Sequence, residues 1–241
     1  MHRRLADTLV AAAALLAAAA PAAAQTVPMK AYTARYQVSY RGLSGGQIEA
    51  TFRPGPTAGL WIYETRAFPN LLGKLAVSSA AHERSTMLIG PGGVVPLEFT
   101  FDDGSSTSEK DVKQTFDWSA KKVTGASKGK PFVLELTPGA QNTASVQAAM
   151  IVERLNGRMP TVFRILTGNR MHDYRYWMEG RQQVLTPYGQ VETEVWANQR
   201  AGSDRVSKVW HAPSLGFVPV QAIQYRKGTP EVQMKLVSLQ R

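Results

Sequence analysis

Apolar and polar residues alternate one by one through most of the chain, and this pattern limits it to β-structure. In the segment 32–40, the residues Tyr32, Ala34, Tyr36, Val38 and Tyr40 fall at every second position. Successive side chains of a strand point to opposite faces of the sheet, so such a segment has one apolar and one polar face. Groups of Gly, Pro, Asn and Thr separate the alternating segments at short intervals. This spacing is typical of antiparallel hairpins.

Strands are expected at residues 32–40, 47–52, 60–66, 78–88, 96–101, 110–118, 121–126, 132–136, 161–166, 170–179, 182–185, 189–196, 207–211, 217–225 and 231–239. One helix is expected at residues 143–155, because Asn142 or Thr143 can cap its start and Gly157 ends it. Many strands with short turns and one central helix predict a mainly β protein. Its antiparallel sheet should curl into a half-barrel, a barrel or a two-layer arrangement.

The first 24 residues have the three-part layout of a secretory signal peptide. Arg3 and Arg4 give a positive start, residues 9–20 are an unbroken apolar run, and residues 21–24 supply a proline followed by three alanines. Cleavage is expected after Ala24, leaving one domain at 25–241. No transmembrane span is expected after cleavage, because the apolar run is shorter than the about 20 residues that a membrane helix needs. The chain has no cysteine for lipid attachment or disulfides, and an alanine-rich export signal favours the periplasm.

The chain is basic, with a formal net charge of +10. Removal of two arginines and one aspartate with the signal leaves +9 on the exported part. Such a surface attracts phosphate, anionic lipid headgroups or polyanionic polysaccharide. The charges are scattered rather than clustered, so the preferred interpretation is an ordinary basic surface without a specific partner. Nucleic acid is not an expected partner of an exported protein.

Several short motifs, in order along the chain, resemble one bacterial family. They are Tyr36–Gly42 followed by Gly46, Gly92–Phe99, Phe116–Trp118, Gln141–Ser145, Thr186–Gly189, and the closing series Trp210, Leu215, Val218–Val220, Gly228 and Leu236. This order is similar to that of the DUF3108 family. The resemblance implies an exported β-rich domain and brings no catalytic residues or cofactor, since the family has no established function. The chain departs from the usual pattern at Asn142, where members carry Asp, and at Ala144, where they carry a bulky apolar residue.

Sequence motifs for catalysis or metal binding are lacking. His82, His172 and His211 fall on separate expected strands without metal-ligand spacing, and His2 leaves with the signal. Ser145 has no visible base partner and no G-x-S-x-G context, so it is interpreted as a small packing residue at the helix entry. No catalytic residue, metal or cofactor is therefore expected.

Two carboxylates leave a hydrolase open as an alternative. Glu192 and Glu194 lie two residues apart on one expected strand, about 7 Å from each other. That separation is compatible with a glycosidase pair. The preferred interpretation is the solvent-facing side of an antiparallel strand, with Val191 and Val195 on the opposite side.

Two segments supply ligand-binding candidates. In residues 171–178, Tyr174 and Tyr176 alternate with Trp177 on the other face, and aromatic side chains with polar groups can line a ligand groove. Phe68, Leu71 and Leu72 form an apolar loop that could touch a membrane or cap a cavity. The alternatives are that aromatic residues simply suit strands and that the loop is tucked into the core.

Three functional hypotheses follow. The first is a non-enzymatic envelope protein whose curved sheet holds a lipid or glycolipid. The second is a structural or interaction module that binds an envelope protein or a polysaccharide. The third is a carboxylate-based hydrolase of envelope polymers. A continuous apolar cavity would favour the first, and two carboxylates facing each other in a cleft would favour the third.

Overall fold

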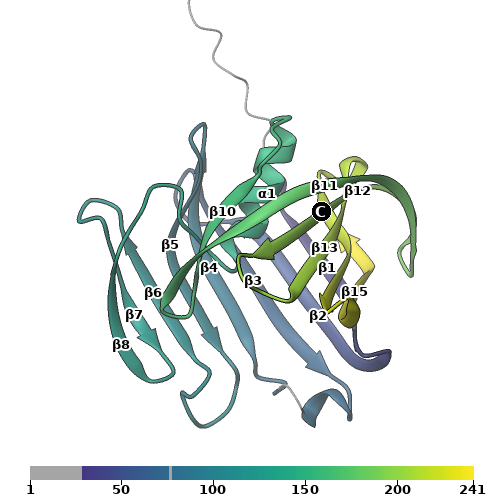
Figure 1. The fold of residues 1–241 in the computed structure, drawn as a ribbon, viewed down its shortest axis with the longest axis horizontal. Coiled ribbons are helices and arrows are strands. Elements are labelled where there is room, and N and C mark those ends of the chain that lie inside the picture. Colours follow the sequence, from purple (N-terminus) through teal and green to yellow (C-terminus); the bar gives the residue numbers. More distant parts are fainter. Residues whose placement is uncertain (1–28, 76–77) are drawn as a thin grey trace, which may run out of the picture.

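A computed structural model describes residues 29–75 and 78–241, and it shows one curled sheet wrapped around one helix (Figure 1). The expected signal peptide and its cleavage site lie outside the described residues. The strands are β1 (Tyr32–Tyr40), β2 (Leu43–Pro54), β3 (Leu60–Pro69), β4 (His82–Gly90), β5 (Gly93–Asp102), β6 (Val112–Asp117), β7 (Lys122–Ser127), β8 (Lys130–Glu135), β9 (Gln141–Asn142), β10 (Val162–Thr167), β11 (Arg170–Thr186), β12 (Gly189–Arg200), β13 (Arg205–Ala212), β14 (Val218–Arg226) and β15 (Thr229–Gln240). The helices are α1 (Ser145–Leu155) and the 3₁₀ turns η1 (Gly73–Leu75) and η2 (Pro213–Leu215).

The fifteen strands form a single sheet in the order β8-β7-β6-β5-β4-β3-β2-β1-β15-β14-β13-β12-β11-β10-β9. Strands that follow one another in the chain are neighbours in the sheet, except β8 and β9, which form its two edges. The first and last strands, β1 and β15, pair with each other at the centre, and β9 pairs with β10 although α1 lies between them in the chain. Every pairing is antiparallel save the short one between β9 and β10. The sheet is not closed into a barrel. The mainly β class, the curled antiparallel sheet and the single α-helix are thus as the sequence predicts.

The strands β1 and β11 differ in detail from what the alternation pattern predicts. In β1 the expected face is confirmed for Tyr32, Ala34 and Tyr36, which are buried. Tyr40, the last residue of the strand before the turn to β2, is exposed instead. In β11 the two predicted strands are one continuous strand, which passes the glycine at 180 through a register shift rather than ending there.

The β9–β10 end of the sheet folds back over the face of β5 to β7. The side-chain amide of Gln114 on β6 donates to the carbonyl of Gly168, after β10, at 2.8 Å. The amide of Gln141 on β9 donates to the carbonyl of Val94 on β5 at 2.9 Å. A small second core of Phe116, Val123, Leu136, Ala140 and Leu166 fills the space beneath. The two glutamines therefore hold the curl in place by satisfying buried backbone groups.

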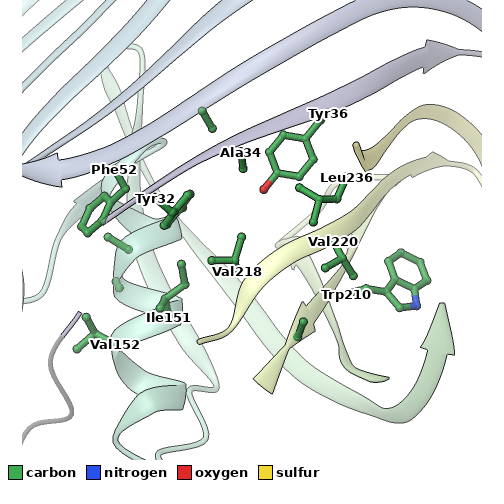
Figure 2. Close-up of a cluster of buried hydrophobic side chains, with 14 of the residues drawn as sticks. Tyr32, Ala34, Tyr36, Phe52, Ile151, Val152, Trp210, Val218, Val220 and Leu236 are labelled. Atoms are coloured by element: carbon green, nitrogen blue, oxygen red, sulfur yellow. The ribbon is translucent and has the colours of Figure 1, made fainter. Parts of the chain in front are cut away.

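The main core lies between the sheet and the inner side of α1. Figure 2 shows Ile151 and Val152 of the helix among side chains from both halves of the sheet, including Tyr32, Phe52 and Val218. Helix residues Ala148 and Ala149 belong to the same cluster. Their small size lets the helix approach the strands closely, and burial of this face supplies most of what holds a short helix together.

Buried polar contacts fix the start of α1. The side-chain oxygen Oδ1 of Asn142 accepts hydrogen bonds from the backbone N–H groups of Ala144 (3.0 Å) and Ser145 (2.6 Å). The Ser145 hydroxyl in turn accepts from the Asn142 N–H at 2.9 Å. The Asn142 amide donates to the hydroxyl of Ser85 on β4 at 2.9 Å. The helix begins two residues later than predicted, but Asn142 satisfies its first N–H groups and ties it to the sheet. Among the described residues, no helix is long and apolar enough to cross a membrane.

Candidate functional site

A cavity of about 530 Å³ lies on the concave side of the sheet, beside the first turn of α1. Its lining comes from β1 to β4, α1 and β10 to β15. Five of the eight tyrosines of the chain line it: Tyr32, Tyr36, Tyr63, Tyr174 and Tyr176. The cross-strand neighbours Val209, Ala222 and Met234 form an apolar part of the wall. The cavity thus combines an apolar wall with phenol groups.

The structure separates the three aromatic candidates of β11. Tyr174 and Tyr176 are half-buried and line the cavity, whereas Trp177 is exposed and does not. This is the alternation of a strand with one inner and one outer face. The rings of Phe163 and Tyr176 pack edge to face, with their centroids 4.9 Å apart, and this contact orients the Tyr176 ring. The ligand-binding role of these residues stays a prediction.

Burial favours the protonated form of four of the cavity tyrosines. It raises the pKa of Tyr32, Tyr36, Tyr63 and Tyr176 above the ordinary range, because a phenolate would lose its solvation. The Tyr36 hydroxyl donates to the carbonyl of Pro219 at 3.0 Å. Within the part of the chain that the structure describes, the hydroxyls of the other tyrosines have no such partner. They are free to hydrogen-bond a ligand.

Among the residues that the structure describes, Glu83 on β4 is the only acidic one that lines the cavity. The hydroxyl of Thr143, just before α1, donates to its carboxylate at 3.0 Å. Burial raises the pKa of Glu83, while hydrogen bonds from Thr143 and Thr65 act in the opposite direction. Sequence reasoning missed this residue, because the pair His82–Glu83 looks like any polar step of a strand. Its cross-strand partners Thr65 and Phe101 lie on the inward-facing side of their own strands, and this alternation could have indicated that Glu83 also faces inward.

A second hollow of about 540 Å³ continues from the cavity toward the loops at one end of the sheet. Ile48, Thr65 and Glu83 line both spaces. Lys74 and Lys110 line only the second, where Lys110 approaches Asp103 at 3.4 Å. This end cleft therefore forms a more polar approach to the tyrosine-lined cavity.

The apolar loop candidates lie outside both spaces. Phe68, Leu71 and Leu72 are exposed, with Leu71 at 84 %. The interpretation that this loop is tucked into the core is wrong. The loop turns away from the core because Asn70 is bonded to the start of β2: its amide donates to the Ser44 carbonyl at 2.8 Å, and its N–H donates to the Gly45 carbonyl at 3.1 Å.

Glu192 and Glu194 do not form a facing pair of carboxylates. Glu192 is exposed, but Glu194 is 1 % exposed, so its assignment to a solvent face is wrong. The Arg154 guanidinium holds both Glu194 oxygens, at 2.9 and 3.2 Å, and Arg181 adds a contact at 3.3 Å. Burial raises the pKa of Glu194, but these hydrogen bonds and that of Trp196 outweigh it and lower the pKa overall. The carboxylate is committed to anchoring the last turn of α1.

Potential metal ligands come together at one place in the described part of the chain. Asp102, at the end of β5, and Asp103 and Asp111, in the loop before β6, have carboxylate oxygens within 4.8 Å of one another. The Asp103 carboxylate accepts hydrogen bonds from Ser105, and with Lys110 nearby these lower its pKa. Partly exposed acidic groups of this kind are common without a metal.

Solved structures resemble the chain in fold. A β-barrel-like protein of a domain of unknown function, DUF1849, from Brucella abortus is 13% identical, with a TM-score of 0.57 over 88% of this chain and 98% of that one. A candidate lipoprotein from Parabacteroides distasonis is 10% identical (TM-score 0.38, covering 88% and 96%). A candidate exported protein with a YmcC-like fold from Bacteroides fragilis is also 10% identical (TM-score 0.33, covering 88% and 97%).

The first of these structures shows the fold, and the two others carry no further argument. The search of curated proteins gives no match. The family model described as "Protein of unknown function (DUF3108)" matches residues 35–237, which is nearly the whole described chain. The chain therefore belongs to the DUF3108 family.

Proposed function

We propose that this protein is a non-enzymatic, periplasmic envelope protein that binds an amphiphilic ligand, a lipid or a lipid-linked glycan, in its concave cavity. The cavity beside α1 is the observation that carries this proposal. Its volume of about 530 Å³ is within the range of about 300–1,000 Å³ of small-molecule sites. Apolar side chains from several strands meet there with a few polar groups, which is the usual composition of such sites.

The chemistry of the lining favours an amphiphile. The apolar wall at Val209, Ala222 and Met234 suits a hydrocarbon chain, and burying that chain is favourable in proportion to the area removed from water. The free hydroxyls of Tyr63, Tyr174 and Tyr176 suit a ligand with polar groups. A purely apolar ligand would leave them unpaired, at a cost in affinity.

A hydrolase has less support. In residues 29–75 and 78–241, one carboxylate lines the cavity, that of Glu83, and its hydrogen-bonding neighbours are the hydroxyls of Thr65 and Thr143. Glu192 and Glu194 cannot act together as a catalytic pair, because Glu194 is buried in an ion pair with Arg154. We therefore propose binding without catalysis.

Native mass spectrometry with lipid extraction tests the proposal on protein purified from its own cell envelope. A co-purifying lipid or glycolipid of constant mass is expected. A bare protein mass after gentle preparation would contradict the proposal and favour an interaction module that binds an envelope protein or polysaccharide.

A pair of variants assigns the ligand to the cavity. Ala222→Trp places an indole inside the cavity wall, whereas Ala120→Trp adds the same group on an exposed turn between β6 and β7. Binding of a dansyl-labelled fatty acid should fall at least about tenfold in the first variant, the loss expected for displacing a well-packed chain segment. It should be unchanged in the second. Equal binding by both variants would place the ligand elsewhere.

A further inference from the structure

Five large apolar side chains gather at the end of the sheet nearest the end cleft. Tyr40 and Leu43 lie at the β1–β2 turn. Phe68 lies near the end of β3, and Leu71 and Leu72 lie in the loop that follows it. Each exposes between 51 and 84 % of its surface. Both loops lie toward the lower right of Figure 1, away from α1. We call these five residues the loop-end patch. Large exposed apolar patches mark places where a protein meets a partner or a membrane.

The two loops are bonded to each other, so the two parts of the patch are held beside one another. Asn70 joins them through its hydrogen bonds to Ser44 and Gly45, and its side-chain oxygen accepts from the Gly73 N–H at 2.8 Å. A Cβ on Gly73 would come within 1.9 Å of the Gly45 carbonyl oxygen. Only glycine allows this approach. These backbone contacts on both sides of Leu71 and Leu72 hold the loop in a conformation that leaves the two leucines exposed.

The charge around the patch selects an anionic partner. The segments 39–48 and 66–75 contain Arg41, Arg66 and Lys74 and no acidic residue. Arg41 is paired with Glu231 at 2.8 Å. Arg66 and Lys74 are exposed and have no ion pair within the described residues. Apolar side chains that project beyond free cations match the interface of a bilayer, where lipid headgroups carry negative charge above an apolar interior.

We propose that the loop-end patch docks on an anionic lipid bilayer, with Phe68, Leu71 and Leu72 entering the interface and Arg66 and Lys74 contacting headgroup phosphates. The surface is close to the site of ligand binding, because Lys74 also lines the end cleft. Docking would therefore bring the approach to the cavity against the membrane. Transfer of a ligand there rests on the proposed function, but the docking itself does not.

Sedimentation with vesicles tests the docking without any ligand. Protein recovered from the envelope fraction is mixed with vesicles of phosphatidylethanolamine and phosphatidylglycerol, or of phosphatidylcholine alone, at low and high salt. Because an apolar N-terminal segment would itself enter lipid, every comparison is between variants with the same N-terminus, established by intact mass. Binding to the anionic vesicles is expected, and it should weaken with salt.

Three variants locate the binding surface. The double change Leu71→Ser and Leu72→Ser should lower vesicle binding by about tenfold or more. Lys74→Glu should lower it by about fivefold or more and reduce its salt dependence. Leu185→Ser removes an equally large exposed leucine from the β11–β12 hairpin and should change nothing. Unchanged urea unfolding is expected for all three, because these side chains are exposed.

Three outcomes would overturn the proposal. The first is absence of wild-type binding to the anionic vesicles. The second is equal binding by the wild type and the double leucine variant. The third is a dimer that the leucine variant loses while neither protein binds vesicles, which would make the patch a contact between two copies. The proposed function is judged separately by the dansyl fatty acid assay, in which the leucine variant should bind like the wild type.

Discussion

The buried histidine of β13 should make the stability of this protein depend on pH between about 7 and 4. His211 is 2 % exposed, and its Nδ1 lies 2.9 Å from the carbonyl oxygen of Phe217. Because a carbonyl oxygen only accepts, this contact places a proton on Nδ1, which donates. Burial lowers the pKa of His211 to about 4, the nearby Arg154 adds to this effect, and the Phe217 hydrogen bond and Glu194 oppose it.

The sign follows from the two states of the protein. In the unfolded chain the imidazole takes up a proton near pH 6.5, but in the folded protein it resists protonation until about pH 4. The unfolded state therefore binds more protons in this window, and the free energy of unfolding falls as the pH falls. A difference of about 2.5 pKa units is worth about 3 kcal/mol in all, of which about 2 kcal/mol should be lost between pH 7.5 and pH 5.

Replacement of His211 by Asn isolates this contribution. The Asn amide nitrogen can donate to the Phe217 carbonyl in place of Nδ1 but does not titrate. Urea unfolding of the wild type and of His211→Asn at pH 7.5 and pH 5, followed by tryptophan fluorescence, gives the free energy of unfolding in each case. Any fixed cost of the substitution cancels, because only the change between the two pH values is compared. The wild type should lose about 2 kcal/mol more than the variant.

Equal losses in the two proteins would refute the reasoning. That result would mean that His211 is protonated in the folded state, paired with Glu194 across the β12–β13 register. The carboxylates contribute alike to both proteins in this range, so they do not disguise the difference. His172, whose pKa is also lowered, is present in both.

Two further predictions concern the ends of α1, and both use the same urea assay. Glu194→Gln should destabilise the protein by about 3–5 kcal/mol, because it leaves the Arg154 cation buried without a counter-ion. The double change Glu194→Leu and Arg154→Met should lower the free energy of unfolding far less, because it leaves no buried charge unpaired. If the single and the double change cost the same, the pair is not buried in solution. Asn142→Ala should lower the free energy of unfolding by about 2 kcal/mol, because it removes the acceptor for two helix N–H groups and the bond to Ser85. Asn142→Asp should recover about half of this loss, because it keeps the acceptor. Full stability of the alanine variant would contradict the capping role.

Local patterns were sufficient to predict the elements and the faces of several strands. The alternation in β1 places Tyr32 and Tyr36 on one face, and that in β11 places Tyr174 and Trp177 on opposite faces, as the structure shows. These faces follow from strand geometry alone, so neighbouring residues contain the information. The pairing of β1 with β15 does not, because it joins segments about two hundred residues apart that have no sequence signal for each other.

The exposure of individual side chains depends on partners that are distant in the sequence, so local patterns did not predict it. Glu192 and Glu194 have the same parity and similar neighbours, yet one is exposed and the other is buried. The difference is Arg154, which arrives from α1, 40 residues earlier in the chain. Likewise Leu71 and Leu72 have the composition of a core segment, but the bonds of Asn70 to β2 hold them outside.

The position of α1 explains how a curled sheet can have both a filled core and a cavity. Ile151 and Val152, toward the end of the helix, are buried among residues of the main core. Val146 and Gln147, in its first turns, line the cavity instead. Asn142 and Arg154 fasten the two ends of the helix to β4 and β12, so the helix cannot slide to fill the space. The cavity wall is therefore set by buried polar bonds rather than by packing alone, which leaves room for a ligand without weakening the core.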